Sequence, residues 1–464
     1  MRHPLVMLAL VLATHPASAQ PERFELGRRL TAFEAAWEAV PDAAARKRAL
    51  KDLPQVTTQF FSFRFGDAGR TLDLAAFALK SDTPPTADAL LARSLFPDPE
   101  SRFLESDAKE LSVVVKPFYP VEGAKLPATV TLRFDGGESV AATADKFPVT
   151  VKVPLPPLKG RESDGTLSLV AVVGKEEHRM SVGVSRAVRR GGRVGDVRLI
   201  SDRLLKFTTI EEATARDRHR VLDELVKGNT AETNIPAARL LAEAEAMQGG
   251  KPCFTADKPG QFWLSVPLGE KKTAPLRVFV PKGLDAAKPV PVVFALHGAG
   301  GSENLFFEGY GAGQIVKECE TRGWFLVATR SGLGFANAPP VPEVLEQLSK
   351  RYPLDAKRVF VVGHSMGAGQ TISLVQKHPK LFAGAAALGG GMVVRDASAF
   401  AQLPVFVGIG DKDLISSGAK NLYKSLTAGG AKNVAYKEYA GVEHMVIVRE
   451  ALPDVFAMFD RAAK

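Results

Sequence analysis

A Gly-x-Ser-x-Gly pentapeptide at 363–367 constrains the fold of this 464-residue chain more than any other feature of its sequence. The run 359–362 before it is apolar, as in a buried strand, and residues 368–374 after it have the composition of a helix. The chain is therefore expected to pass from strand to helix through a sharp bend, with glycine where a Cβ would clash. Ser365 would then expose its hydroxyl beside a helix N-terminus, which stabilises negative charge. The adjacent His364 is interpreted as a structural neighbour of the bend.

From residue 251 onward, strand-like and helix-like segments alternate, which predicts a mainly parallel sheet flanked by helices. The expected strands are almost continuously apolar, as in strands that are buried on both faces. Strands are expected at 262–268, 276–280, 290–296, 325–329, 358–363, 383–388 and 405–409, and helices at 311–322, 342–350, 366–378, 417–428 and 449–462. We therefore predict an α/β domain over residues 251–464.

The preceding residues have other periodicities, and we divide them into three regions. Apolar residues at helical spacing predict a small helical region over 20–102. In its first helix these residues are Leu26, Leu30, Phe33 and Trp37. Period-two segments between 111 and 185 predict a β-sandwich of immunoglobulin-like type over 103–190. Residues 191–250 return to helical periodicity and are expected to form a helical connector.

Residues 1–19 have the composition of a secretory signal peptide. The apolar run 5–13 follows a short polar start, and Ala-Ser-Ala at 17–19 supplies small residues before a cleavage point. The alternative, a buried N-terminal helix, conflicts with Pro4 and Pro16. The apolar run is too short to span a bilayer, which takes about 20 residues. We expect the mature protein to be secreted or periplasmic.

Charge and cysteine content argue against two classes of partner. The formal net charge is +9, but the basic residues are scattered and an exported protein rarely meets nucleic acid. The one local cluster of arginines, at 186–193, is expected to be a solvated linker rather than an anion-binding patch. Cys253 and Cys319 are the only cysteines, and no Cys-x-x-Cys or histidine cluster accompanies them, which argues against a metal site. Whether these two cysteines pair stays open.

A second glycine-rich segment, His-Gly-Ala-Gly-Gly at 297–301, follows an expected strand. Its glycines let the backbone come close to a bound oxygen atom. We predict that the N–H of Ala299, with Gly298 as the alternative, forms an oxyanion hole together with the N–H of Met366. His297 is expected to orient this loop rather than to take part in catalysis.

A serine nucleophile needs a histidine base and an acid that orients this base. After a bend of this kind, the acid and then the histidine follow the serine along the chain. The expected strand 405–409 ends in Gly-Asp-Lys-Asp, which makes Asp413 the preferred acid and Asp411 the alternative. His444, in a Gly-Val-Glu-His segment, is the only histidine beyond residue 378. The predicted catalytic residues are therefore Ser365, Asp413 and His444.

Residues 255–464 resemble the α/β-hydrolase superfamily. The segments HGAGGSE, GHSMGAG, GDKD and GVEH are similar to those of secreted esterases, polyhydroxybutyrate-depolymerase-like proteins and related peptidases. The resemblance implies acyl-enzyme chemistry without a metal or an organic cofactor. Ala299 stands where an HGGG pattern has glycine, and a backbone N–H survives this change.

On these grounds the sequence predicts an exported carboxylesterase that acts on a small or polymeric ester. Two alternatives stay open: a serine peptidase whose N-terminal region restricts access, and a surface-binding protein with an incidental hydrolase domain. Only residues 389–404 lie between the sixth expected strand of the parallel sheet and the strand before the acid, which predicts a site without a lid. Aromatic residues of two loops, 302–311 and 331–340, are expected to line the pocket: Phe306, Phe307, Tyr310 and Phe335.

Overall fold

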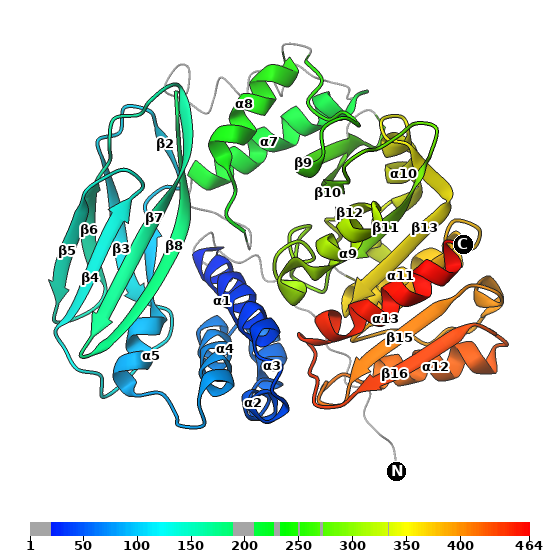
Figure 1. The fold of residues 1–464 in the computed structure, drawn as a ribbon, viewed down its shortest axis with the longest axis horizontal. Coiled ribbons are helices and arrows are strands. Elements are labelled where there is room, and N and C mark those ends of the chain that lie inside the picture. Colours follow the sequence, from blue (N-terminus) through cyan, green and yellow to red (C-terminus); the bar gives the residue numbers. More distant parts are fainter. Residues whose placement is uncertain (1–19, 189–207, 227–232, 249–250, 270–271, 333) are drawn as a thin grey trace.

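The computed structural model describes residues 20–188, 208–226, 233–248, 251–269, 272–332 and 334–464. The expected signal peptide and most of the arginine cluster lie outside the described residues. Figure 1 shows a β-sandwich on one side and an α/β domain on the other, with two groups of helices between them. In the described part of the chain, no helix is long and apolar enough to cross a membrane.

The C-terminal domain is built on one eight-stranded sheet. Its strands are β9 (Gly260–Pro267), β10 (Thr273–Val280), β11 (Val290–Leu296), β12 (Phe325–Thr329), β13 (Leu354–His364), β14 (Gly384–Leu388), β15 (Val405–Gly410) and β16 (Val434–Tyr439). They lie in the order β16-β15-β14-β13-β11-β12-β10-β9. β10 pairs antiparallel with β9 and β12, and all other neighbours are parallel. The predicted mainly parallel sheet is confirmed.

Helices cover both faces of this sheet, because successive strand residues point to opposite sides. In β11, Phe294 lies in one core with Ile372, whereas Val293 lies in a second core with Val448. The first face carries α10 (Val341–Ser349), α11 (Met366–Lys377) and α12 (Ser417–Ala428), and the second carries α9 (Gln314–Arg322) and α13 (Ile447–Ala462). This strand order, with a strand–turn–helix bend after β13, is that of the α/β-hydrolase fold.

Two smaller sheets precede this domain and pack face to face. One contains β1 (Leu95–Pro99), β3 (Glu110–Pro117) and β6 (Val149–Pro154), in that order. The other contains β2 (Phe103–Glu105), β8 (Glu176–Ala187), β7 (Glu162–Val173), β4 (Ala128–Phe134) and β5 (Ser139–Ala144), in that order. Side chains of both sheets, such as Val113 and Leu132, fill one core. The immunoglobulin-like type of this sandwich stays a prediction.

Two features of the sandwich differ from the expectations. β1 falls inside the region expected to be helical, 20–102, but it pairs with β3. Pro97 and Pro99 conceal it in the sequence, because proline is tolerated in a sheet only at an edge, and β1 is an edge strand. Arg186 is not part of a solvated linker: it lies in β8, is 3% exposed and donates to the carbonyl oxygen of Pro156.

The first group of helices packs on the α/β domain. It comprises α1 (Gln20–Ala39), α2 (Ala43–Ala49), α3 (Gln55–Phe61) and α4 (Phe65–Lys80). The apolar stripe of α1 is buried there, since Leu30 and Trp37 share a core with Tyr310 and Val448. Trp37 Nε1 also donates to Glu450 Oε1 at 3.0 Å. Helices from the start of the chain are therefore part of the core of the C-terminal domain.

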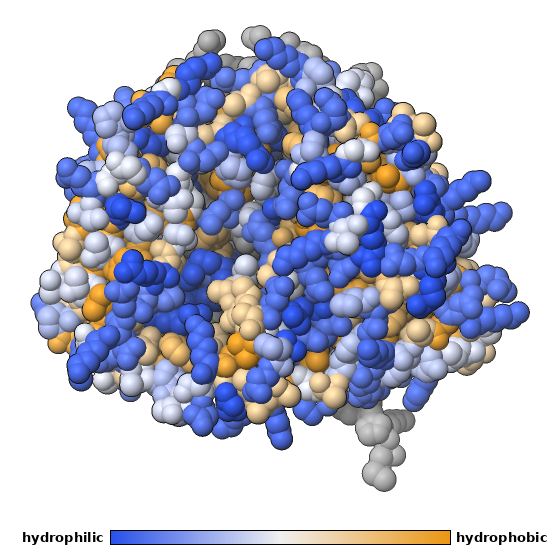
Figure 2. Space-filling model, viewed as in Figure 1, coloured by the Kyte–Doolittle hydropathy of each residue, from blue (hydrophilic) through white to orange (hydrophobic). Residues whose placement is uncertain are grey.

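The second group of helices joins the sandwich to the other end of the α/β domain. α7 (Ile210–Val226) and α8 (Ala237–Gln248) contribute Leu222 and Leu240 to a small core that also contains Phe103 of β2. The two cysteines do not pair: Cys253 and Cys319 are both free thiols. Figure 2 shows that hydrophilic side chains predominate on the face viewed, with smaller hydrophobic patches between them.

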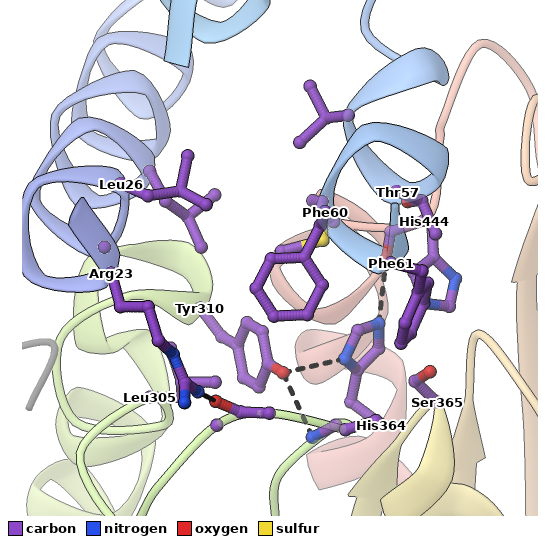
Figure 3. Close-up of a pocket in the computed structure, with 18 of the residues that line it drawn as sticks. Arg23, Leu26, Thr57, Phe60, Phe61, Leu305, Tyr310, His364, Ser365 and His444 are labelled. Atoms are coloured by element: carbon purple, nitrogen blue, oxygen red, sulfur yellow. Dashed lines mark hydrogen bonds between the residues drawn. The ribbon is translucent and has the colours of Figure 1, made fainter. Parts of the chain in front are cut away.

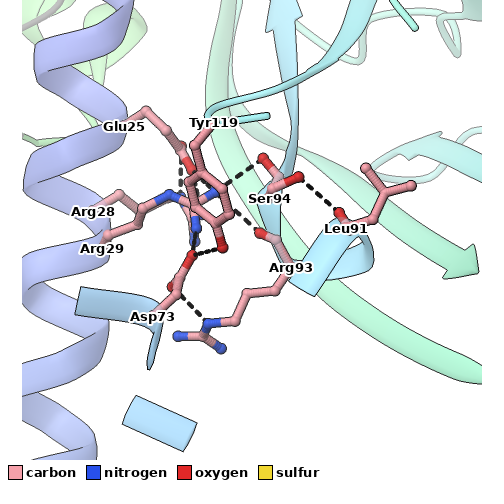
Figure 4. Close-up of polar contacts among 8 residues, drawn as sticks. All are labelled: Glu25, Arg28, Arg29, Asp73, Leu91, Arg93, Ser94 and Tyr119. Carbon is pink, nitrogen blue, oxygen red and sulfur yellow. Dashed lines mark hydrogen bonds and ion pairs between the residues drawn. The ribbon is translucent and has the colours of Figure 1, made fainter. Parts of the chain in front are cut away.

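A buried polar network ties α1 to α4 and to the sandwich (Figure 4). Arg29 of α1 forms an ion pair with Asp73 of α4 and donates to the carbonyl oxygen of Ser94 at 3.1 Å. Asp73 also accepts a hydrogen bond from Tyr119 Oη at 2.8 Å and pairs with Arg93 at 2.6 Å. Arg29 and Asp73 are each 1% exposed, so water does not compensate their charges. α5 (Ala87–Ser94) links this network to β1.

Replacing Asp73 with alanine is expected to lower the free energy of unfolding by about 3 kcal/mol, because it removes a carboxylate from buried cationic partners. The control is Asp67→Ala on the same helix, since the Asp67 side chain is 52% exposed and lies 3.5 Å from Arg64. This control is expected to cost less than about 1 kcal/mol. Urea unfolding of both variants measures the difference, and equal costs would show that the network does not stabilise the fold.

Candidate active site

Ser365 sits at the predicted sharp bend. β13 ends at His364 and α11 begins at Met366, and Ser365 between them has φ 57° and ψ −114°. This backbone conformation is strained for a residue with a side chain. The two flanking glycines are required by close approach: a Cβ on Gly363 would overlap the carbonyl oxygen of Gly367, and a Cβ on Gly367 would overlap that of Leu296. The bend therefore holds the serine side chain at the carboxyl end of β13.

His444 and Asp413 meet at the same edge of the sheet. His444 Nδ1 donates to Asp413 Oδ2 at 2.8 Å, and both residues are buried, at 4% and 5% exposure. Asp413 Oδ1 accepts from the N–H of Ile415 at 2.8 Å, which fixes the carboxylate. A hydrogen bond at Nδ1 places the proton there and leaves Nε2 of the neutral imidazole as a proton acceptor.

Asp411, the alternative acid, points elsewhere. Its Oδ1 accepts from the N–H of Gly441 at 2.7 Å, and its other oxygen lies 3.2 Å from Lys412 Nζ. Among the hydrogen bonds of the described residues, none joins Asp411 to His444. The geometry favours Asp413 over Asp411, and the assignment of the catalytic acid stays a prediction.

Ser365 and His444 line one cavity, as Figure 3 shows. No hydrogen bond between Ser365 Oγ and His444 occurs among those found in the described part of the chain. Catalytic hydrogen bonds are often long in the absence of substrate and shorten when substrate binds. The structure thus brings all three predicted residues together at one edge of the sheet, and their catalytic roles stay predictions.

The loop 297–301 lines the cavity through residues 298–301. The N–H of Gly298 donates to Tyr310 Oη at 3.2 Å, whereas that of Ala299 has no acceptor within the described residues. Met366 is the first residue of α11, so its N–H has no partner in the helix. This arrangement favours Ala299 and Met366 over Gly298 as oxyanion-hole donors, and their assignment stays a prediction.

His364 lies next to the bend and also joins two other segments through hydrogen bonds of its ring. Its Nε2 donates to the carbonyl oxygen of His444 at 2.8 Å, and its Nδ1 accepts from Tyr310 Oη at 2.9 Å. Burial above all holds the pKa of His364 well below its ordinary value, so the ring is neutral. With the bond from Gly298 to Tyr310, this chain connects the loop 297–301 to His444 (Figure 3). No motif points to this role, because its partners come from three separate segments.

His297 holds the loop that follows β11. Its Nδ1 donates to the carbonyl oxygen of Gly298 at 2.7 Å, and its Nε2 accepts from the N–H of Ser331 at 3.1 Å. Burial lowers the pKa of His297, which agrees with a neutral ring. In the described part of the chain, no group of three or more His, Cys, Asp or Glu residues could hold a metal ion.

A buried carboxyl group, that of Glu443, lies next to His444. Glu443 Oε1 accepts from the N–H groups of Met445 and Val446 at 2.8 and 2.9 Å, and Oε2 has no partner among the described residues. Burial raises the pKa of Glu443 to about 7. Burial, and then the charge of Glu443, raise the pKa of Glu34 on α1 well above its ordinary value. Two buried carboxyl groups with raised pKa values therefore lie where α1 approaches the loop that carries His444.

The free energy of unfolding is expected to fall as the pH rises from about 4.5 to about 7, because in this range Glu443 is ionised when unfolded but protonated when folded. The difference between these two pKa values corresponds to about 3 kcal/mol. Glu443→Gln keeps an oxygen acceptor for both N–H groups and is expected to lose the part of this pH dependence that Glu443 contributes, whereas Glu34 keeps its own part. The exposed Glu438→Gln serves as the control. Identical pH profiles for Glu443→Gln and the parent would contradict the raised pKa.

The cavity is covered, in contrast to the site without a lid that the sequence predicts. It has a volume of about 110 Å³ and lies between the loops of the α/β domain and the helices α1, α3 and α4. The cover comes from the start of the chain and is not an insertion after β14. For this reason the short segment 389–404 gives no sign of it.

The aromatic residues expected to line the pocket are placed differently. Phe306 and Phe307 are 1% and 5% exposed, belong to the core below α1 and do not line the cavity. Tyr310 does line it, and the side chain of Phe335 is not among those described. Instead, Phe60 and Phe61 of α3 supply the phenylalanine rings in the cavity wall. In the sequence these two residues belong to the aromatic segment 60–65, which is typical of a buried core. No motif near this segment links it to Ser365.

Solved structures similar to this chain are of low identity. A feruloyl esterase module from Clostridium thermocellum, solved with sinapinate, is 18% identical, over 45% of this chain and 90% of that chain, with a TM-score of 0.38. A thermostable esterase is 16% identical, over 80% of this chain and 96% of that chain, with a TM-score of 0.38. An S-formylglutathione hydrolase from Agrobacterium tumefaciens is 18% identical, over 46% and 98%, with a TM-score of 0.37. No family model matches the chain.

Proposed function

We propose that this protein is an exported serine hydrolase that cleaves carboxylic esters through Ser365, His444 and Asp413. The observation that carries the proposal is the buried hydrogen bond from His444 to Asp413, beside a cavity that His444 and Ser365 both line. A neutral histidine oriented in this way can accept the proton of a serine hydroxyl. Export is supported by the composition of residues 1–19.

In the proposed reaction, Ser365 Oγ attacks the ester carbonyl carbon while His444 Nε2 accepts its proton. The N–H groups of Ala299 and Met366 stabilise the negative carbonyl oxygen, and Asp413 stabilises the charged imidazole. His444 then donates the proton to the alcohol oxygen as the C–O bond breaks, which leaves the acyl group on Ser365. Water, deprotonated by His444, attacks this acyl-enzyme; the acid leaves, and Ser365 regains its proton.

The cavity favours a small ester over a peptide substrate. Its volume of about 110 Å³ leaves little room for a peptide on both sides of the scissile bond. The side that α1, α3 and α4 contribute is mainly apolar, so it offers few partners for peptide N–H and C=O groups. These features support ester hydrolysis.

The test uses the purified mature protein, short-chain p-nitrophenyl esters and a fluorophosphonate probe. We expect ester turnover, and mass spectrometry should locate the probe on Ser365 alone. Labelling without turnover of any ester would favour a peptidase. A protein that neither reacts with the probe nor cleaves esters would favour a surface-binding protein with an inactive hydrolase domain.

A further inference from the structure

We propose, building on the function proposed above, that helices α1 and α3 select the acyl group that Ser365 accepts. The pocket that they complete takes short apolar acyl groups of about two to five carbon atoms. The determinants of selectivity therefore lie near the start of the chain, outside the α/β domain that carries the nucleophile.

The cavity wall has two sides that come from different parts of the chain. One side is formed by the loop 298–301, with Leu305 and Tyr310, and contains Ser365 and His444. The opposite side is formed by apolar side chains of the N-terminal helices: Leu26, Leu30, Val56, Phe60 and Leu72. Figure 3 shows Leu26 of α1 and Phe60 of α3 facing Tyr310 and His364 across the cavity. An apolar group is thus enclosed between two parts of the chain that are far apart in the sequence.

The helices α1 and α3 also contact the loop 297–301, whose N–H groups are proposed to bind the oxyanion. The Arg23 guanidinium on α1 donates to the carbonyl oxygen of Gly300. The ring of Phe60 lies directly over the same residue, since a Cβ on Gly300 would be 2.7 Å from Phe60 Cζ. Gly300 has φ +78°, a conformation that side chains disfavour. α1 and α3 therefore both contact the loop at Gly300, and the Phe60 ring narrows the cavity there.

The group held between these walls corresponds to the acyl part of the ester. The alcohol departs when the acyl-enzyme forms, whereas the acyl group stays on Ser365 until water attacks. A pocket with an apolar wall beside Ser365 suits the part that stays. An apolar cavity of about 150 Å³ in another protein holds benzene. A cavity of about 110 Å³ therefore takes a somewhat smaller group.

The experiment measures kcat/KM for p-nitrophenyl acetate, butyrate and octanoate. For the parent, kcat/KM should fall about tenfold or more from butyrate to octanoate. Phe60→Ala should raise the octanoate-to-butyrate ratio about tenfold or more, because each additional methylene that can be buried is worth about fourfold. Phe60→Leu should raise the same ratio by a smaller factor, and it replaces the alanine variant if that variant does not fold.

The matched control is Phe63→Ala, because the ring of Phe63 is 56% exposed and does not line the cavity. Its octanoate-to-butyrate ratio should stay within about twofold of the parent.

A second readout keeps this inference separate from the proposed function. Xenon binds apolar cavities without any chemistry, so crystals of the parent under xenon should show an atom between Phe60 and Tyr310. Ester turnover with a ratio that neither Phe60 variant changes would overturn the selectivity role of α3 and leave the hydrolase function intact. Xenon in the cavity of a protein that cleaves no ester would overturn the proposed ester hydrolysis but retain the apolar pocket. A cavity that stays empty under xenon would overturn the pocket itself.

Discussion

Replacing Ser365 with alanine is expected to lower kcat for p-nitrophenyl butyrate by about a millionfold, because no other group is placed to attack the carbonyl carbon. Binding is expected to change little, since alanine keeps the Cβ. The fluorophosphonate label should disappear in the same variant. The initial rate of p-nitrophenolate release, measured at high enzyme concentration, gives the residual kcat.

Two further variants show whether Ser365 works together with the histidine. The double variant Ser365→Ala with His444→Ala should be no slower than Ser365→Ala alone, because residues that act as one unit have non-additive effects. Ser373→Ala, on the helix that follows the bend, is the matched control and should keep parental activity. A Ser365→Ala protein that retains more than about a hundredth of the parental kcat would refute its role as nucleophile.

Asp413→Asn is expected to lower kcat by about ten-thousandfold. Asp413 Oδ2 accepts a hydrogen bond from His444 Nδ1 at 2.8 Å. The asparagine amide can donate there instead, which favours the tautomer with the proton on Nε2 and removes the proton acceptor that Ser365 needs. The loss should appear in kcat more than in KM, because the acid acts on the transition state.

Asp411→Asn is the control for this prediction. Asp411 is two residues away, and its carboxylate binds the N–H of Gly441. Its amide oxygen can still accept that hydrogen bond, so kcat should stay within about threefold of the parent. The opposite result, with Asp411→Asn inactive and Asp413→Asn active, would make Asp411 the acid and would mean that the loop rearranges when substrate binds.

The α/β domain could be predicted because its signals are local. Strands buried on both faces must be apolar along their length, so segments such as 290–296 are recognisable without knowing their neighbours. The bend at Ser365 needs glycine at both flanking positions, because a Cβ would overlap the backbone. Steric requirements of this kind act within a few residues and therefore leave a motif.

The edge strand β1 could not be predicted in the same way. Its prolines, Pro97 and Pro99, argue against a strand within a sheet, and only the position of β1 beside β3 makes them acceptable. The choice between Asp413 and Asp411 was likewise open, because both follow the same strand. The direction in which each carboxylate points depends on its contacts with Ile415 and Gly441.

The α/β class of residues 251–464, the sharp bend and a short set of candidates for the site can be predicted from the order of residues alone. The surroundings of Ser365 become known only from the folded chain: the cover by α1, α3 and α4, the link through His364 and Tyr310, and the buried Glu443. The difference lies in the range of the interactions. Steric and periodic constraints act between neighbours in the chain, whereas a cavity wall and a buried hydrogen bond depend on which distant segments pack together.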